Sequence, residues 1–137
     1  MVENDLNFLY ILGPIGSGKT HLMMSIAEDL RKNNPDLNLK YVRANEFVDE
    51  LIEAIKNRKT ADFRNEYKKL DILLFDNLEF LKEKESSQEE LYYICDFLKL
   101  QNKKIIFASS KPINEIIANE GLLTFINNAN EVLLKER

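Results

Sequence analysis

Residues 13–20 read GPIGSGKT, and this stretch constrains the chain more than any other. Glycine, four residues, glycine, lysine and then serine or threonine is the pattern of a loop that wraps phosphates with its backbone N–H groups. Glycines allow this because they adopt positive φ angles without steric cost. We expect a phosphate site formed by Gly13, Pro14, Ile15, Gly16, Ser17, Gly18, Lys19 and Thr20.

Two side chains of this loop predict the rest of a nucleotide site. Lys19 supplies a positive charge for the outer phosphates, and Thr20 supplies a hydroxyl ligand for Mg²⁺. The helix that begins here turns its positive N-terminal end toward the anion. Apolar residues 8–12 before the loop are typical of a strand, and the spacing of apolar residues over 20–31 predicts a helix.

Alternating strand and helix patterns continue along the chain. We expect further strands at 39–43, 72–75, 104–108 and 131–134. We expect helices beginning at an Asn45 cap, at a Thr60 cap, at the overlapping capping boxes of Ser86 and Ser87, and over 114–118. The fold class is therefore α/β, with about five parallel strands and helices on both faces of the sheet.

Asp76 follows the strand over 72–75, whose continuous apolar character is typical of a strand buried on both faces. Ligands of parallel sheets bind beyond the carboxyl ends of the strands. Because Gly13 and Asp76 both lie at such ends, we expect them to meet over one site, where Asp76 and Thr20 share the Mg²⁺ shell.

Composition adds a few limits. The 137 residues fit one domain, and the net charge of −4 argues against dominant nonspecific binding of nucleic acid. No apolar run is long enough to cross a membrane and the N-terminus lacks the pattern of a secretory signal, so we expect a cytoplasmic protein without membrane contact. Cys95 is expected to be a small buried apolar residue, and His21 a partly buried polar one without a catalytic role.

Residues 7–110 resemble the AAA+ ATPase core of the bacterial replication initiator DnaA. The matching segments are GKTHL at 18–22, EFV at 46–48, DFRNEY at 62–67, DILLFD at 71–76, EFL at 79–81, SQEE at 87–90 and IIFASS at 105–110. The resemblance implies a three-layer P-loop NTPase sandwich that binds ATP or ADP with Mg²⁺, with a family-specific helical insertion at about 45–69. It also implies single-stranded DNA contacts at Ile52, Lys84 and Ser87, although the family usually has arginine where this chain has Ser86.

The chain departs from the family pattern at several points. The position that normally holds a second acid after the aspartate is Asn77, which cannot take a proton from water and is a candidate only for positioning the water. Glu79 is the candidate that could substitute as the base, but we expect the chain to bend away after Asp76. Lys111 replaces the polar residue that senses the outer phosphate, and it is a candidate to contact that phosphate itself. Residues 120–126 lack the arginine finger of the family. We expect the helical lid to be absent, since the sequence ends at Arg137, and the upstream adenine-binding segment to be short.

Three functions remain open at this point. In the first, the chain is a DnaA-like module that binds ATP in replication initiation or its control, with little or no hydrolysis. In the second, it is an active ATPase that uses Glu79 or a residue of a partner. Alternatively, it is an interaction module without nucleotide that caps or inhibits an initiator or helicase assembly. A replication initiator or replicative helicase is the expected partner, and self-assembly is left open.

Overall fold

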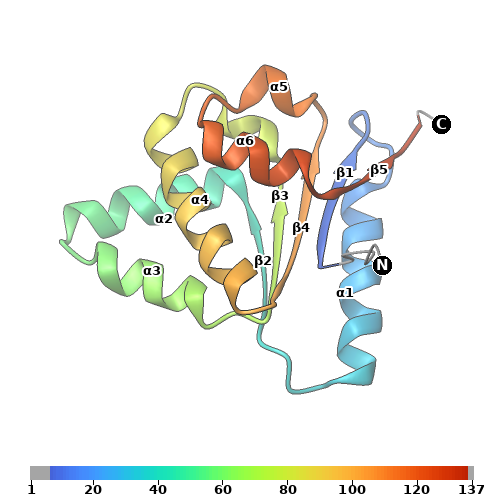
Figure 1. The fold of residues 1–137 in the computed structure, drawn as a ribbon, viewed down its shortest axis with the longest axis horizontal. Helices are drawn as coiled ribbons and strands as arrows, with labels where there is room; N and C mark the ends of the chain where they lie inside the picture. Colours follow the sequence, from blue (N-terminus) through green and yellow to red (C-terminus); the bar gives the residue numbers. More distant parts are fainter. Residues whose placement is uncertain (1–6, 136–137) are drawn as a thin grey trace.

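A computed structural model describes residues 7–135 of the chain. Five strands form one parallel sheet in the order β2-β3-β4-β1-β5 (Figure 1). Their bounds are β1 Phe8–Leu12, β2 Leu39–Arg43, β3 Ile72–Asp76, β4 Lys104–Ser109 and β5 Asn130–Leu133. The strands end together at the top of Figure 1, so the residues that follow β1 and β3 meet at one edge of the sheet.

Helices cover both faces of this sheet, which makes the expected three layers (Figure 1). Helix α1 (Lys19–Asn33) packs on one face. The opposite face carries α2 (Ala44–Lys56), α3 (Thr60–Lys68), α4 (Glu85–Leu100), α5 (Ile113–Ile116) and α6 (Glu120–Asn127). A short 3₁₀ helix, η1 (Leu78–Leu81), follows β3.

Strand residues alternate between two apolar cores, one on each face. In β3, Ile72 and Leu74 pack toward α1, whereas Leu73 and Phe75 pack toward α2 and α4. All four are fully buried, as expected for a strand in the middle of a parallel sheet. Because side chains alternate between the two faces along a strand, Asp76 lies on the same face as Leu74, the face that α1 covers.

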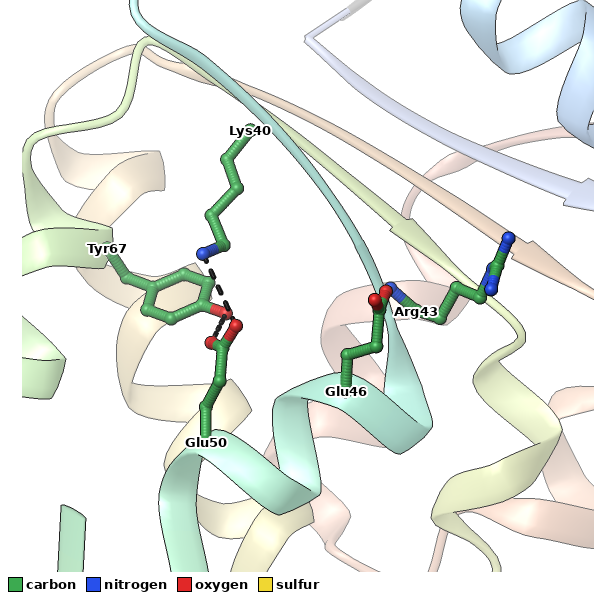
Figure 2. A network of polar contacts seen from close by, with 5 residues as sticks. All are labelled: Lys40, Arg43, Glu46, Glu50 and Tyr67. Carbon is green, nitrogen blue, oxygen red and sulfur yellow. Dashed lines mark hydrogen bonds and ion pairs between the residues drawn. The ribbon is translucent and has the colours of Figure 1, made fainter. Parts of the chain in front are cut away.

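The insertion expected at 45–69 is the helix pair α2 and α3, and polar contacts hold it against the rest of the domain. The Arg64 guanidinium binds the Glu90 carboxylate of α4 through two hydrogen bonds of 2.6 and 2.8 Å. Figure 2 shows a second link, in which the Tyr67 hydroxyl donates to Glu50 at 2.7 Å and Lys40 of β2 approaches the same carboxylate at 3.5 Å. Burial raises the pKa of Tyr67, and the Glu50 hydrogen bond raises it further.

Asp71 connects the loops at the opposite end of the sheet. Its carboxylate accepts the Asn38 backbone N–H and the Lys103 ammonium, both at 2.8 Å. These two contacts, the backbone N–H first, lower the pKa of Asp71 below its ordinary value. They join the residues that precede β2, β3 and β4.

Several expected helix starts were wrong. Helix α2 begins before Asn45, and the Glu46 carboxylate accepts the Arg43 backbone N–H at 3.0 Å. Helix α4 begins at Glu85, so Ser86 and Ser87 lie inside its first turn and do not cap it. Helix α6 was not expected, although the Asn119 side chain caps it by accepting the Leu122 N–H at 2.8 Å.

Two further expectations concern the burial of Cys95 and the absence of a membrane-spanning helix. Cys95 is fully buried on α4, as predicted, and burial raises the pKa of its thiol. Within residues 7–135, the structure contains no helix with the length and apolar character needed to cross a membrane.

Candidate functional site

The loop between β1 and α1 has the backbone shape of a phosphate-binding loop. Gly16 and Gly18 have φ angles of 83° and 93°, a region that residues with a side chain rarely enter. Gly13 is required for a different reason, because a Cβ there would lie 2.7 Å from the Ser17 hydroxyl and 2.8 Å from Leu134 Cβ. The Ser17 hydroxyl is buried and, among the residues that the structure describes, has no hydrogen-bond partner.

Lys19 and Thr20 open α1 directly after this loop. The Lys19 ammonium donates to the Pro14 carbonyl at 2.9 Å, so the charge lies over the loop. The Thr20 hydroxyl donates to Asp76 Oδ2 at 2.7 Å. The structure thus brings together the two residues that were expected to share a magnesium ion.

Asp76 is buried at the end of β3 and accepts three hydrogen bonds. Oδ2 accepts from Thr20 and, at 2.6 Å, from the Tyr41 hydroxyl, while Oδ1 accepts the Asn77 N–H at 2.8 Å. Burial raises the pKa of Tyr41, and its hydrogen bond to the Asp76 carboxylate raises it further. Sequence reasoning missed Tyr41, because its role depends on β2 lying beside β3.

Asn77 and Glu79 follow Asp76 and line the same pocket as Lys19 and Thr20, which has a volume of about 380 Å³. Asn77 has a φ of 62°, so the chain turns sharply after the strand as expected. The 3₁₀ helix that follows returns Glu79 to the pocket, and the bend therefore does not remove it from the site. The Glu79 carboxylate accepts the Ser110 N–H at 3.0 Å, which fixes its direction.

Lys111 is not among the residues that line this pocket. Its backbone carbonyl accepts the hydroxyls of Ser109 at 2.7 Å and Tyr10 at 3.2 Å. Burial raises the pKa of Tyr10 to about 12, so this hydroxyl is a donor at neutral pH. The side chain of Lys111 is exposed beyond this anchored backbone.

His21 is exposed, which corrects the expectation that it is partly buried. It lines a second open pocket of about 790 Å³ along α1, next to the loop, together with Met24, Ser25 and Glu28. Within the described part of the chain, no three His, Cys, Asp or Glu side chains cluster as a metal site. A magnesium ion would therefore depend on Thr20, Asp76, phosphate oxygens and water, a ligand set that suits it.

The three candidate DNA contacts lie in different environments. Ile52 on α2 is 46% exposed, although most apolar residues of this helix face the core. Lys84 precedes α4 and holds its ammonium 4.4 Å from the centre of the Phe80 ring. Ser87 is 7% exposed and offers almost no surface for a contact.

Comparisons with known proteins agree with this geometry. The family described as "Bacterial DnaA ATPAse domain" matches residues 1–125. The chromosomal replication initiator protein DnaA of Deinococcus radiodurans is 42% identical over 117 residues, which are 85% of this chain and 25% of that protein. The chain thus spans about a quarter of the length of this curated relative.

Solved structures give the same result. Replication initiator DnaA bound to AMPPCP and single-stranded DNA matches with a TM-score of 0.88 and 30% identity, over 96% of this chain and 41% of that one. Domain III of the Thermotoga maritima replication initiation protein DnaA matches with a TM-score of 0.89 and 33% identity, over 94% and 55% of the two chains. The DnaC helicase loader, at 16% identity and a TM-score of 0.77, shares the fold.

Proposed function

Because this chain belongs to the family of bacterial DnaA ATPase domains, we propose that it binds ATP or ADP with Mg²⁺ as a nucleotide-binding module in the initiation or control of DNA replication. The observation that carries the proposal is the 2.7 Å hydrogen bond from Thr20 to Asp76 beside the left-handed glycines of the loop. The relative bound to AMPPCP supports nucleotide binding. Bound magnesium would neutralise charge on the outer phosphates, with Thr20 and Asp76 as its protein ligands.

The proposed module hydrolyses ATP slowly. An amide at position 77 cannot accept the proton of an attacking water, and general-base assistance is typically worth about 10²–10⁴-fold in rate. Glu79 lines the pocket, but its carboxylate is already held by the Ser110 N–H at 3.0 Å. This engagement favours a structural role for Glu79 over proton transfer.

A second candidate is an active ATPase in which Glu79 acts as the base. Its place in the pocket with Thr20 and Asp76 supports this alternative. The alternative requires Glu79 to keep one oxygen free for water while the other accepts the Ser110 N–H. A carboxylate has the acceptor capacity for both.

Phosphate release by three forms of the chain separates these two candidates. With slow hydrolysis and no base, we expect Asn77→Asp to raise turnover by about 10²-fold, the lower end of general-base assistance, and Glu79→Gln to change turnover less than about twofold. Aspartate tolerates the left-handed backbone of position 77, so the change should leave the fold intact. If the wild type showed measurable turnover and Glu79→Gln showed none, Glu79 would instead be established as the base.

Calorimetric titration with ATP and Mg²⁺ tests nucleotide binding itself. The proposal predicts saturable binding of the wild-type chain. If neither ATP nor ADP binds, the nucleotide function is wrong and the interaction module without nucleotide becomes the better explanation.

We also propose that single-stranded DNA contacts the surface around Ile52 and Lys84. The relative bound to single-stranded DNA supports this role. Exposed apolar area at Ile52 suits van der Waals packing against a base or sugar, and the Lys84 ammonium suits a phosphate. The burial of Ser87 argues against including it.

Fluorescence anisotropy with a labelled oligothymidylate measures this contact. We expect Ile52→Ser and Lys84→Gln each to weaken binding by about 3- to 10-fold, with a shallower salt dependence for Lys84→Gln only. Leu100→Ser is the matched control, because Leu100 is 72% exposed at the far end of α4. No binding at low salt, or equal effects of all three changes, would contradict the proposed DNA surface.

A further inference from the structure

Arg43 lines the phosphate pocket although it lies far from the loop in the sequence. It is the last residue of β2 and is paired in register with Asp76, the last residue of β3. Side chains of a strand alternate between faces, so Arg43 shares the α1 face with Tyr41. The loop, Thr20 and Asp76 lie on this same face.

Strand β2 carries two cationic side chains, Lys40 and Arg43, which lie on opposite faces of the sheet. Lys40 lies on the opposite face, where its ammonium approaches Glu50 at 3.5 Å and lies 5.0 Å from the centre of the Tyr67 ring. Figure 2 shows that the Arg43 side chain extends away from this network. The charge of Lys40 is therefore balanced within the insertion, whereas that of Arg43 is directed to the pocket.

Within residues 7–135, Arg43 forms no ion pair with a carboxylate. The neighbouring Tyr41 side chain is the main reason that the pKa of Arg43 lies above its ordinary value. Tyr41 in turn donates to Asp76 at 2.6 Å. Arg43 thus lines the same pocket as Tyr41 and Asp76, and its exposed guanidinium has donors available for a phosphate.

We propose that Arg43 binds the outermost phosphate of a nucleoside triphosphate in this pocket, as a guanidinium supplied by the chain's own second strand. The proposal rests on the nucleotide-binding function proposed above. A planar guanidinium pairs with two phosphate oxygens at once, which a lysine cannot do. Because a diphosphate lacks the outermost group, Arg43 makes the site prefer ATP to ADP.

Charge in the pocket supports this assignment. Asp76 and Glu79 contribute two carboxylates, whereas Lys19 is the other cation among the lining residues. A triphosphate adds more negative charge than Lys19 and one divalent ion neutralise. A second cation at the pocket wall therefore favours the triphosphate over the diphosphate.

The test compares ATP and ADP affinities, each with Mg²⁺, by calorimetry of wild type, Arg43→Gln and Arg43→Lys. We expect Arg43→Gln to weaken ATP binding by about 10- to 100-fold, the range for lost hydrogen bonds to a charged group, and ADP binding by less than about twofold. Arg43→Lys should restore part of the ATP preference, because it keeps the charge but loses the paired contact.

Lys40→Gln is the matched control, since it removes a cation from the same strand on the other face. We expect it to leave the ratio of the two affinities unchanged. An unchanged ratio in Arg43→Gln, with wild type binding ATP, would overturn the role of Arg43 alone. Failure of wild type to bind either nucleotide would overturn the proposed function instead. The contact that links Arg43 to Glu46 uses the backbone N–H of Arg43, so the variants should keep the start of α2.

Discussion

Replacing Lys19 with alanine is expected to weaken binding of ATP with Mg²⁺ by roughly 100-fold, or about 2.8 kcal/mol. This is the upper range for hydrogen bonds to a charged group, and the ammonium is the charge that the loop directs to the outer phosphates. The change should not disturb the fold, because within residues 7–135 the Lys19 side chain hydrogen-bonds only to the Pro14 carbonyl of its own loop. Calorimetric titration measures the affinity, and urea unfolding without nucleotide checks the stability.

Lys82→Ala serves as the control for lost positive charge. Lys82 is exposed after η1 and does not line the phosphate pocket, so its removal should leave the affinity within about twofold. Equal affinities of wild type and Lys19→Ala would contradict phosphate binding by the loop. If Lys19→Ala lost nucleotide but kept its effect on a replication initiator or helicase, the interaction module would be favoured.

Replacing Phe47 with alanine is expected to lower the free energy of unfolding by about 3–5 kcal/mol, the usual cost of deleting a buried ring. Phe47 is fully buried, and its ring centre lies 5.3–5.4 Å from those of Phe63, Tyr67 and Phe75. It therefore joins both insertion helices to the central strand β3. Equilibrium unfolding in urea gives the change directly.

Ile55→Ala on the same helix is the matched control. Ile55 is 55% exposed, and surface changes are usually within about 0.5 kcal/mol. A cost below about 1 kcal/mol for Phe47→Ala would mean that the insertion is not packed against the sheet in solution. Such a result would also mean that Ile52, which lies on the same helix, has no fixed position for the proposed DNA contact.

The sequence predicts the sheet and the loop well because both depend on local patterns. The apolar run before Asp76 identifies a buried strand, and the glycine spacing identifies the backbone shape of 13–20. The coarse fold and the family resemblance were confirmed. Together these explain why Thr20 and Asp76, distant in sequence, were expected to meet.

The rest depended on information that local patterns lack. Tyr41 and Arg43 join the site because β2 neighbours β3, and a single sequence does not specify strand order. Glu79 returns to the pocket through a 3₁₀ turn that follows a positive φ at Asn77. Asparagine tolerates this conformation, but its presence in a sequence does not predict it. Helix α6 is the exception, because the Asn119 cap and the helical spacing of Leu122, Phe125 and Ile126 are local patterns that indicate a helix.

The hydrogen bond between Thr20 and Asp76 has a thermodynamic consequence for nucleotide binding. Together with the Tyr41 hydroxyl and the Asn77 N–H, it satisfies a buried carboxylate that would be costly without partners. Because the Thr20 hydroxyl donates its hydrogen to Asp76, its oxygen keeps lone pairs with which it can bind magnesium, so the two contacts are compatible. Nucleotide then acts as an additive stabiliser whose effect grows with concentration, reaching about 2.7 kcal/mol at a hundred times its dissociation constant. The stability of this domain would thus report the ratio of nucleotide concentration to affinity over a wide range.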